Sequence, residues 1–114
     1  MQLQPCDLPH QSEIHIWKVS LLQQEPAAGS LEPVLSREEK RRSAQFHFDH
    51  LRRNYILTHG ALRVILGSYC GRSPETLHFE RGPYGKPFLA DPSDILTFNL
   101  SHCEDLALIV VAVG

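Results

Sequence analysis

The pattern of apolar and polar residues predicts several strands. Residues 13–21 alternate, with Ile14 and Ile16 on one side and Trp17 on the other, as in a strand with two partly covered faces. The last run, residues 106–113, is apolar without interruption, which suits a central strand buried on both faces. We therefore expect a sheet in which the last strand of the chain lies in the middle.

Two helices are expected between these strands. Ser36 and Glu39 have the spacing of a capping box, so a helix begins here and should end near residue 45. A longer helix is predicted at 49–70, ending at Gly71, a residue suited to a left-handed cap. Gly60 inside it costs about 1 kcal/mol relative to alanine, which indicates a close contact between this helix and a strand. The apolar stripe of the longer helix consists of Leu51, Tyr55, Leu62, Ile65, Leu66 and Tyr69.

Turn-forming residues divide the rest of the chain. The remaining expected elements are a loose arm at 1–12, a surface loop at 23–33, a one-turn helix at 73–76, short strands at 77–81 and 86–90, a turn at 91–94 and a strand at 98–102. Together the elements predict an α+β fold in which one long helix packs on a mainly antiparallel sheet. At 114 residues, we expect a single domain spanning 1–114.

Charge bears on the class of partner. The formal net charge of −2 argues against a general nucleic-acid binder, which is usually strongly basic. Six of the eleven Lys and Arg residues nevertheless fall within 37–53, so a local anion site stays open. Nucleic-acid binding through 37–42 is the weaker alternative, because Glu38 and Glu39 interrupt the basic run.

Cysteine usage and hydropathy indicate the compartment. Cys6, Cys70 and Cys103 are odd in number and far apart, which favours a reduced protein. No apolar run approaches the ~20 residues of a membrane helix, and the N-terminus lacks a signal-peptide pattern. A cytoplasmic protein without a membrane partner is therefore expected. Neither Cys6 with His10 nor His102 with Cys103 belongs to a spaced set of four zinc ligands, so no metal site is predicted.

The candidate chemistry lies in two short motifs. Gly85 and Pro87 flank Lys86, so a flexible residue and a residue of fixed φ hold this lysine in an extended or turn conformation. The strand predicted at 98–102 alternates apolar and polar residues, carries Ser101 and ends in His102. A lysine, a hydroxyl and an imidazole are groups that can bind phosphate together.

These motifs resemble the N-terminal half of the surfactin-type 4'-phosphopantetheinyl transferases. The resemblance covers about residues 17–114 and rests on Gly85-Lys86-Pro87, on Phe98-Asn99-Leu100-Ser101-His102 and on the apolar strand that follows. It implies one of two pseudo-symmetric halves with the active site between them. Members of the family transfer the 4'-phosphopantetheine arm of coenzyme A to a serine of an acyl or peptidyl carrier protein, using Mg²⁺.

The resemblance also implies roles for individual residues. Lys86 and His102 match contacts to the coenzyme A phosphates, and an imidazole beside phosphate is favoured in its protonated form. Glu39 stands where a relative can have a lysine, and Asn54 where many have an arginine, so Arg53 or Arg52 would substitute. The coenzyme A site implied in this way comprises Tyr84, Gly85, Lys86, Pro87, Ser101, His102, Arg42 and Arg53.

The largest departure from the family lies at the end of the sequence. In relatives the last strand leads into an Asp-x-Glu motif that holds Mg²⁺, whereas this sequence stops at Gly114. We therefore expect no catalytic residue or metal ligand in the chain, Mg²⁺ only in the complete enzyme, and no transfer by the chain alone. Expected partners are a carrier protein and the missing C-terminal half, or a second copy through the exposed face. The alternative is a non-catalytic coenzyme A-binding or interaction module left by truncation.

Overall fold

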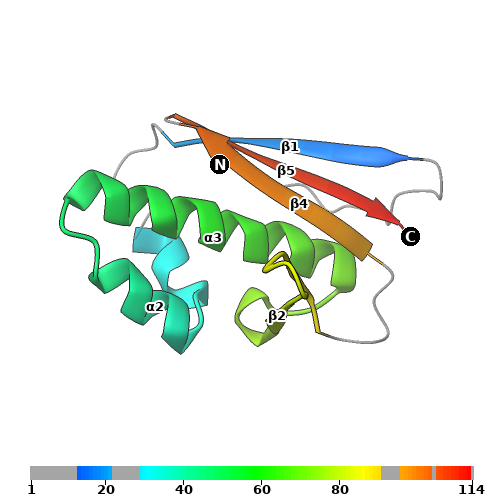
Figure 1. The fold of residues 1–114 in the computed structure, drawn as a ribbon, viewed down its shortest axis with the longest axis horizontal. Helices are drawn as coiled ribbons and strands as arrows, with labels where there is room; N and C mark the ends of the chain where they lie inside the picture. The colour runs from blue at the N-terminus through cyan, green and yellow to red at the C-terminus, as the bar shows by residue number, and fades with distance from the viewer. Residues whose placement is uncertain (1–12, 22–28, 91–95, 104, 114) are drawn as a thin grey trace.

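A three-stranded antiparallel sheet lies against one long helix in the computed structural model (Figure 1). The structure describes residues 13–21, 29–90, 96–103 and 105–113. The strands of this sheet are β1 (Ile14–Ser20), β5 (Leu106–Val113) and β4 (Leu96–Cys103), in that spatial order. Both pairings are antiparallel, and β5 is the central strand. The predicted α+β fold and the central place of the last strand are confirmed.

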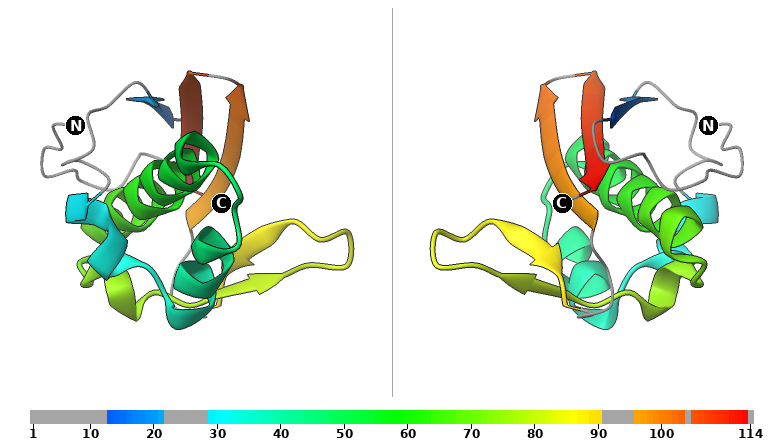
Figure 2. Two further views of the ribbon diagram at one scale, coloured as in Figure 1. Left: turned by 90° about the vertical axis from the view of Figure 1, so that its left-hand side faces the viewer. Right: turned by 90° about the vertical axis from the view of Figure 1, so that its right-hand side faces the viewer.

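The two faces of β5 differ in burial. Ala107, Ile109 and Val111 point into the core and are 0% exposed, whereas Leu108 and Val110 on the other face are only half-buried. The prediction of a strand buried on both faces is therefore wrong for one face, because the long helix covers only one side of the sheet (Figure 2). We call the uncovered side the outer face; its residues are Ile14, Ile16, Lys18, Ser20, Thr97, Asn99, Ser101, Cys103, Leu106, Leu108, Val110 and Ala112.

The edge strand β1 is tied to the long helix by one tyrosine. The Tyr69 hydroxyl accepts a hydrogen bond from Trp17 Nε1 at 2.8 Å and lies 2.7 Å from His15 Nδ1. On the outer face of the same strand, Ile14 and Ile16 are 64% and 63% exposed. Only one face of β1 is therefore well covered, which corrects the expectation of two partly covered faces.

The start of the first helix and the end of the long helix lie where their capping residues predict. The first, α2 (Arg37–Ala44), has the complete capping box: Ser36 Oγ accepts from the Glu39 N–H at 3.1 Å, and Glu39 Oε1 accepts from the Ser36 N–H at 2.9 Å. The long helix α3 (Asp49–Cys70) ends at Gly71, whose φ of 66° is left-handed. Two 3₁₀ turns flank them, η1 (Glu32–Val34) at the end of the predicted loop and η2 (Pro74–Thr76).

A short hairpin projects from the body of the molecule (Figure 2). Its strands are β2 (Phe79–Arg81) and β3 (Pro87–Leu89), each shorter than predicted. Gly85, with φ of 81°, allows the turn between them to close, and its N–H donates to the Gly82 carbonyl at 2.9 Å. The predicted 1–12 arm, the 91–94 turn and most of the 23–33 loop lie outside the described residues.

In the part of the chain that the structure describes, no helix has the length and apolar character needed to cross a membrane.

Gly60 marks a close approach between α3 and the segment before η1. A Cβ added at Gly60 would lie 2.7 Å from Leu31 Cβ and 3.4 Å from the Leu31 carbonyl oxygen. The close contact expected from this glycine exists, but its partner is Leu31 and not a strand. The glycine therefore permits packing that a larger residue would disturb.

We predict that Gly60→Ala destabilises the fold, because the new methyl group overpacks the Leu31 contact at a cost of about 1 to 3 kcal/mol. This effect should exceed the gain of about 1 kcal/mol in helix propensity. Thermal unfolding measures it, with Gly29→Ala as the control, since a Cβ built at Gly29 meets no atom of the described residues within 4 Å apart from its chain neighbours. An unchanged or higher melting temperature for Gly60→Ala would contradict the prediction.

Candidate functional site

Three adjoining pockets run from the end of β4 to the hairpin turn. The histidine pocket, of about 300 Å³, lies between α3 and β4. The central pocket, of about 290 Å³, lies between α2 and β2, and the hairpin pocket, of about 320 Å³, lies between the hairpin turn and the start of β4. Tyr55 lines the first two and Pro87 the last two, so the three form a row.

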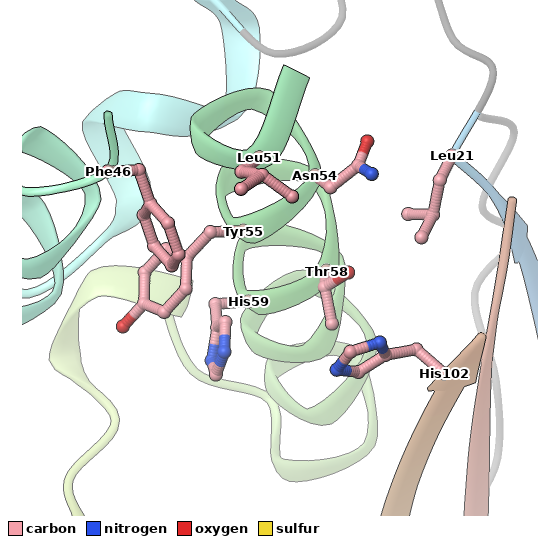
Figure 3. Close-up of a pocket in the computed structure, with 8 residues that line it drawn as sticks. All are labelled: Leu21, Phe46, Leu51, Asn54, Tyr55, Thr58, His59 and His102. Atoms are coloured by element: carbon pink, nitrogen blue, oxygen red, sulfur yellow. The ribbon is translucent and has the colours of Figure 1, made fainter. Parts of the chain in front are cut away.

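Aromatic rings form one wall of the histidine pocket. Phe46 packs on Tyr55 with ring centroids 5.4 Å apart, and Tyr55 stacks on His59 at 4.2 Å with an interplanar angle of 30°. His102 points from β4 toward the helix on the opposite side (Figure 3). The pocket is therefore an apolar hollow that presents two imidazoles and a phenol. Its lining residues are Leu21, Phe46, Leu51, Asn54, Tyr55, Thr58, His59 and His102.

The titration of two lining residues is shifted by the pocket. Burial is the main cause that lowers the pKa of His59 below its ordinary value; Glu39 acts in the opposite direction, while His102, Arg63 and Arg42 lower it further. Burial, and next the charge of Glu39, raise the pKa of Tyr55. At neutral pH the pocket thus holds a neutral His59 and a protonated Tyr55 hydroxyl that can donate a hydrogen bond.

A buried guanidinium joins the elements around these pockets. Arg63, 3% exposed, donates from Nε to Glu39 Oε1 at 2.6 Å. Its Nη1 donates to the carbonyls of Pro74 and Leu77 at 3.0 and 2.9 Å, and its guanidinium lies 5.0 Å from the centre of the Phe79 ring. Arg63 therefore connects α3 to α2 and to the base of the hairpin. It fixes the position of the hairpin relative to the histidine pocket.

Several predicted site residues lie along the row of pockets. His102 lines the histidine pocket and Arg42 the central one. The predicted segment of the hairpin lines the hairpin pocket with Tyr84, Lys86 and Pro87, next to the positive-φ Gly85. Lys86 and Tyr84 are exposed to solvent, Tyr84 to 99%.

Two predicted residues lie elsewhere. Ser101 pairs with Leu108 on the outer face and is exposed, because successive residues of a strand point to opposite faces. The structure therefore does not bring its hydroxyl together with the His102 imidazole. Arg53 lines a separate pocket beside Lys40 and Arg52, and is not among the residues that line the row. The expected roles of both residues stay predictions.

Comparison with known proteins places the chain in a family. Residues 17–113 match the family described as "4'-phosphopantetheinyl transferase, N-terminal". The chain belongs to the 4'-phosphopantetheinyl transferase family. Over 101 residues it is 40% identical to the 4'-phosphopantetheinyl transferase HetI of Nostoc sp. (strain PCC 7120 / SAG 25.82 / UTEX 2576), covering 87% of this chain and 43% of HetI. The chain thus spans less than half the length of this relative.

Solved structures share the fold at low sequence identity. The holo-[acyl-carrier-protein] synthase of Helicobacter pylori, solved in complex with coenzyme A, has a TM-score of 0.61 and 19% identity over 90% of this chain and 100% of its own. The Bacillus anthracis str. Ames holo-(acyl-carrier-protein) synthase, in complex with CoA (3',5'-ADP), has a TM-score of 0.59 and 18% identity over 86% of this chain and 91% of its own. These likenesses establish a shared fold.

Sequence reasoning about this transferase-family chain missed three residues of the site. Tyr55 was placed only in an apolar stripe, and His59 and Arg63 were not singled out. Tyr55, His59 and Arg63 are each four residues apart on α3, so they share one face of the helix. An imidazole and a guanidinium within an otherwise apolar stripe were the signal that could have found them.

The described residues do not provide an evident metal site. Among them, no group of three His, Cys, Asp or Glu side chains lies close enough together to hold a metal ion. Asp91, Asp94 and Glu104 lie outside the described residues. Mg²⁺ prefers near-octahedral oxygen coordination, and the described part of this transferase-family chain does not fit that requirement.

We predict that Arg63→Met destabilises the chain by about 3 to 5 kcal/mol, the cost of breaking a buried ion pair from one side. The matched control is Arg52→Met, whose exposed side chain lies 3.6 Å from Asp49 and should cost less than about 1 kcal/mol. Urea-induced unfolding measures both. An equal decrease in the free energy of unfolding for the two variants would show that the Arg63 contacts do not hold the fold together.

Proposed function

We propose that this chain binds the nucleotide of coenzyme A as part of an enzyme that transfers 4'-phosphopantetheine to a serine of an acyl or peptidyl carrier protein. The observation that carries the proposal is the row of pockets that starts at His102 and ends at Lys86. Family membership supports the reaction class, and the coenzyme A complexes of the structural relatives support the ligand.

The chemistry of the row suits an extended anionic ligand. Arg42 acts electrostatically on both Tyr55 and His59, so a guanidinium lies within range of the histidine pocket. Cations and neutral donors from three elements can then surround phosphate, and charge-assisted hydrogen bonds of this type are the stronger ones. Lys86 supplies a further point charge at the hairpin turn, where the exposed ring of Tyr84 offers a surface for a base.

In the proposed reaction, the serine oxygen of the carrier protein forms a bond to the β-phosphorus of coenzyme A. The bond from that phosphorus to the 3',5'-ADP oxygen breaks, 3',5'-ADP leaves with that oxygen, and the serine proton passes to solvent. The residues of this chain would hold the 3',5'-ADP portion in place, principally Lys86 and His102. Ser101 and Arg53 lie outside the row of pockets, so only the resemblance to the family supports them as further candidates. Because the described residues form no metal-binding cluster, we assign them no part in Mg²⁺ chemistry.

The finer placement within the family is also a proposal. The Phe98-Asn99-Leu100-Ser101-His102 motif supports the surfactin-type group, in which a domain like this one is the first of two pseudo-symmetric halves.

We further propose one domain spanning the chain, supported by the single core cluster of the described residues. A cytoplasmic location is supported by the free, exposed thiol of Cys103.

We predict that coenzyme A binds the chain and that Lys86→Ala and His102→Ala each weaken binding by about tenfold to a hundredfold, the range for loss of one charge-assisted hydrogen bond. Calorimetric titration measures the affinity, with and without Mg²⁺, which should make no difference. The control is Arg72→Ala, because Arg72 is exposed just after α3 and is not among the residues that line the row of pockets or the Arg53 pocket. Absence of binding, or equal weakening by Arg72→Ala, would refute the assignment.

A carrier-protein loading assay separates the transferase from its alternative. Binding of coenzyme A without Mg²⁺-dependent loading by the chain alone is the expected result. If loading is also absent when the remainder of a full-length relative is supplied in trans, a non-catalytic coenzyme A-binding module becomes the better description. Loading by the chain alone would show that residues outside our assignment complete the active site.

We also propose that the outer face associates with a second copy of the chain. Ile14 and Ile16 are exposed on β1 beside the half-buried Leu108 and Val110 of β5, and apolar patches of this kind mark contact surfaces. Ile16→Thr should therefore shift the chain toward monomer in sedimentation equilibrium. Phe48→Ser is the control, because Phe48 is 58% exposed at the start of α3, away from the outer face. A wild-type monomer at high concentration would contradict the proposal.

A further inference from the structure

His59 is a residue of the histidine pocket that has no counterpart among the coenzyme A contacts implied by the family resemblance. It projects from the middle of α3 into the space that His102 enters from β4 (Figure 3). Its side chain is 31% exposed, so it is largely covered but still reached from the pocket. Tyr55 stacks on one side of the ring at 4.2 Å, which holds the imidazole in one orientation.

The position of Glu39 indicates which ring nitrogen of His59 faces the carboxylate. Nδ1 of His59 lies 3.8 Å from Glu39 Oε2. The other carboxylate oxygen, Oε1, already accepts from Arg63 Nε and from the Ser36 N–H, so the carboxylate is fixed in place. With Nδ1 nearest to Glu39, Nε2 is the ring nitrogen that is left for a ligand.

The groups around His59 come from every element packed against it. Glu39 of α2 favours a positive charge on the His59 ring. A positive charge there is disfavoured by Arg42 of α2, by His102 of β4 and by Arg63 of α3 itself. Glu38 and Arg81 act on the neighbouring Tyr55. Cations outnumber carboxylates among the groups that act on His59, which suits a site that is completed by an anion.

We propose that His59 is a phosphate-binding residue that forms, with His102, a two-imidazole site for a phosphate monoester and takes up a proton when the phosphate binds. The inference rests on the proposed function and extends it, because it adds a residue to the site and specifies a dianionic group as its ligand. A protonated His59 lies between the phosphate and Glu39, so both neighbours carry negative charge. The apolar wall of Phe46 and Tyr55 reduces screening by water.

The sign of the pH dependence follows from the free protein. Burial keeps the pKa of His59 below its ordinary value, so the ring is neutral at pH 7 when the pocket is empty. A phosphate dianion raises the pKa of His59, so the complex binds one more proton between the free and bound pKa values. Affinity should therefore rise as pH falls from 8 toward about 6.5, above the second phosphate pKa of about 6.

The test is calorimetric titration of the full chain with 3',5'-ADP at pH 7 in buffers of different ionisation enthalpy, which counts the protons taken up. Wild type should take up protons, while His59→Gln should bind about tenfold more weakly or worse and lose the His59 share of uptake. His59→Arg, which carries a permanent charge, should retain binding without that uptake. Titration with 3'-dephospho-coenzyme A should show no dependence on His59, because it lacks the monoester.

The control and the possible outcomes separate this inference from the proposed function. His50→Gln, an exposed histidine of the same helix, should change neither affinity nor uptake. If neither coenzyme A nor 3',5'-ADP binds wild type, the proposed function fails and this inference with it. If both bind and His59→Gln changes neither affinity nor uptake, only the role of His59 is overturned. If His59→Gln does not fold, His59→Arg provides the test instead. Proton uptake equal to that of wild type in His59→Arg would overturn the role of His59.

Discussion

The ion pair between Glu39 and Arg63 is the interaction on which the arrangement of the site depends. One guanidinium reaches α2 through this carboxylate and reaches the hairpin base through two carbonyls and the Phe79 ring. A buried pair of this kind often adds little net stability compared with apolar packing. Its effect is geometric, because it fixes the angle at which the hairpin with Lys86 leaves the body. The distance between the two ends of the pocket row is set in this way.

The same carboxylate also links folding to electrostatics. Glu39 completes the capping box of α2, neutralises Arg63 and lies against His59. The Glu39 carboxylate that caps the start of α2 therefore also lies beside the His59 imidazole at the pocket. Substitution at this position would therefore alter the helix, the hairpin and the pocket together. Effects of such residues on binding and on stability are not additive, since they share one partner.

Local signals predicted the elements, whereas tertiary packing decided which faces matter. Ser36, Glu39 and Gly71 are sufficient to place the start of α2 and the end of α3, because capping depends on a few neighbouring backbone groups. The unbroken apolar run of β5 could not reveal that α3 covers only one of its sides. For the same reason the alternation at the end of β4 was predictable, but not that Ser101 faces away from the pocket. His59 was overlooked because an apolar helical stripe is normally core.

The alternation of β4 has a consequence for changes in chain length. Phe98 and His102 belong to the helix side of the sheet, while Asn99 and Ser101 belong to the outer side. Removal or insertion of a single residue within this strand would exchange the two sets, because side chains alternate with a period of two. Point substitutions on the outer side leave the pocket residues where they are. Family members should therefore keep the number of residues between Phe98 and His102 constant.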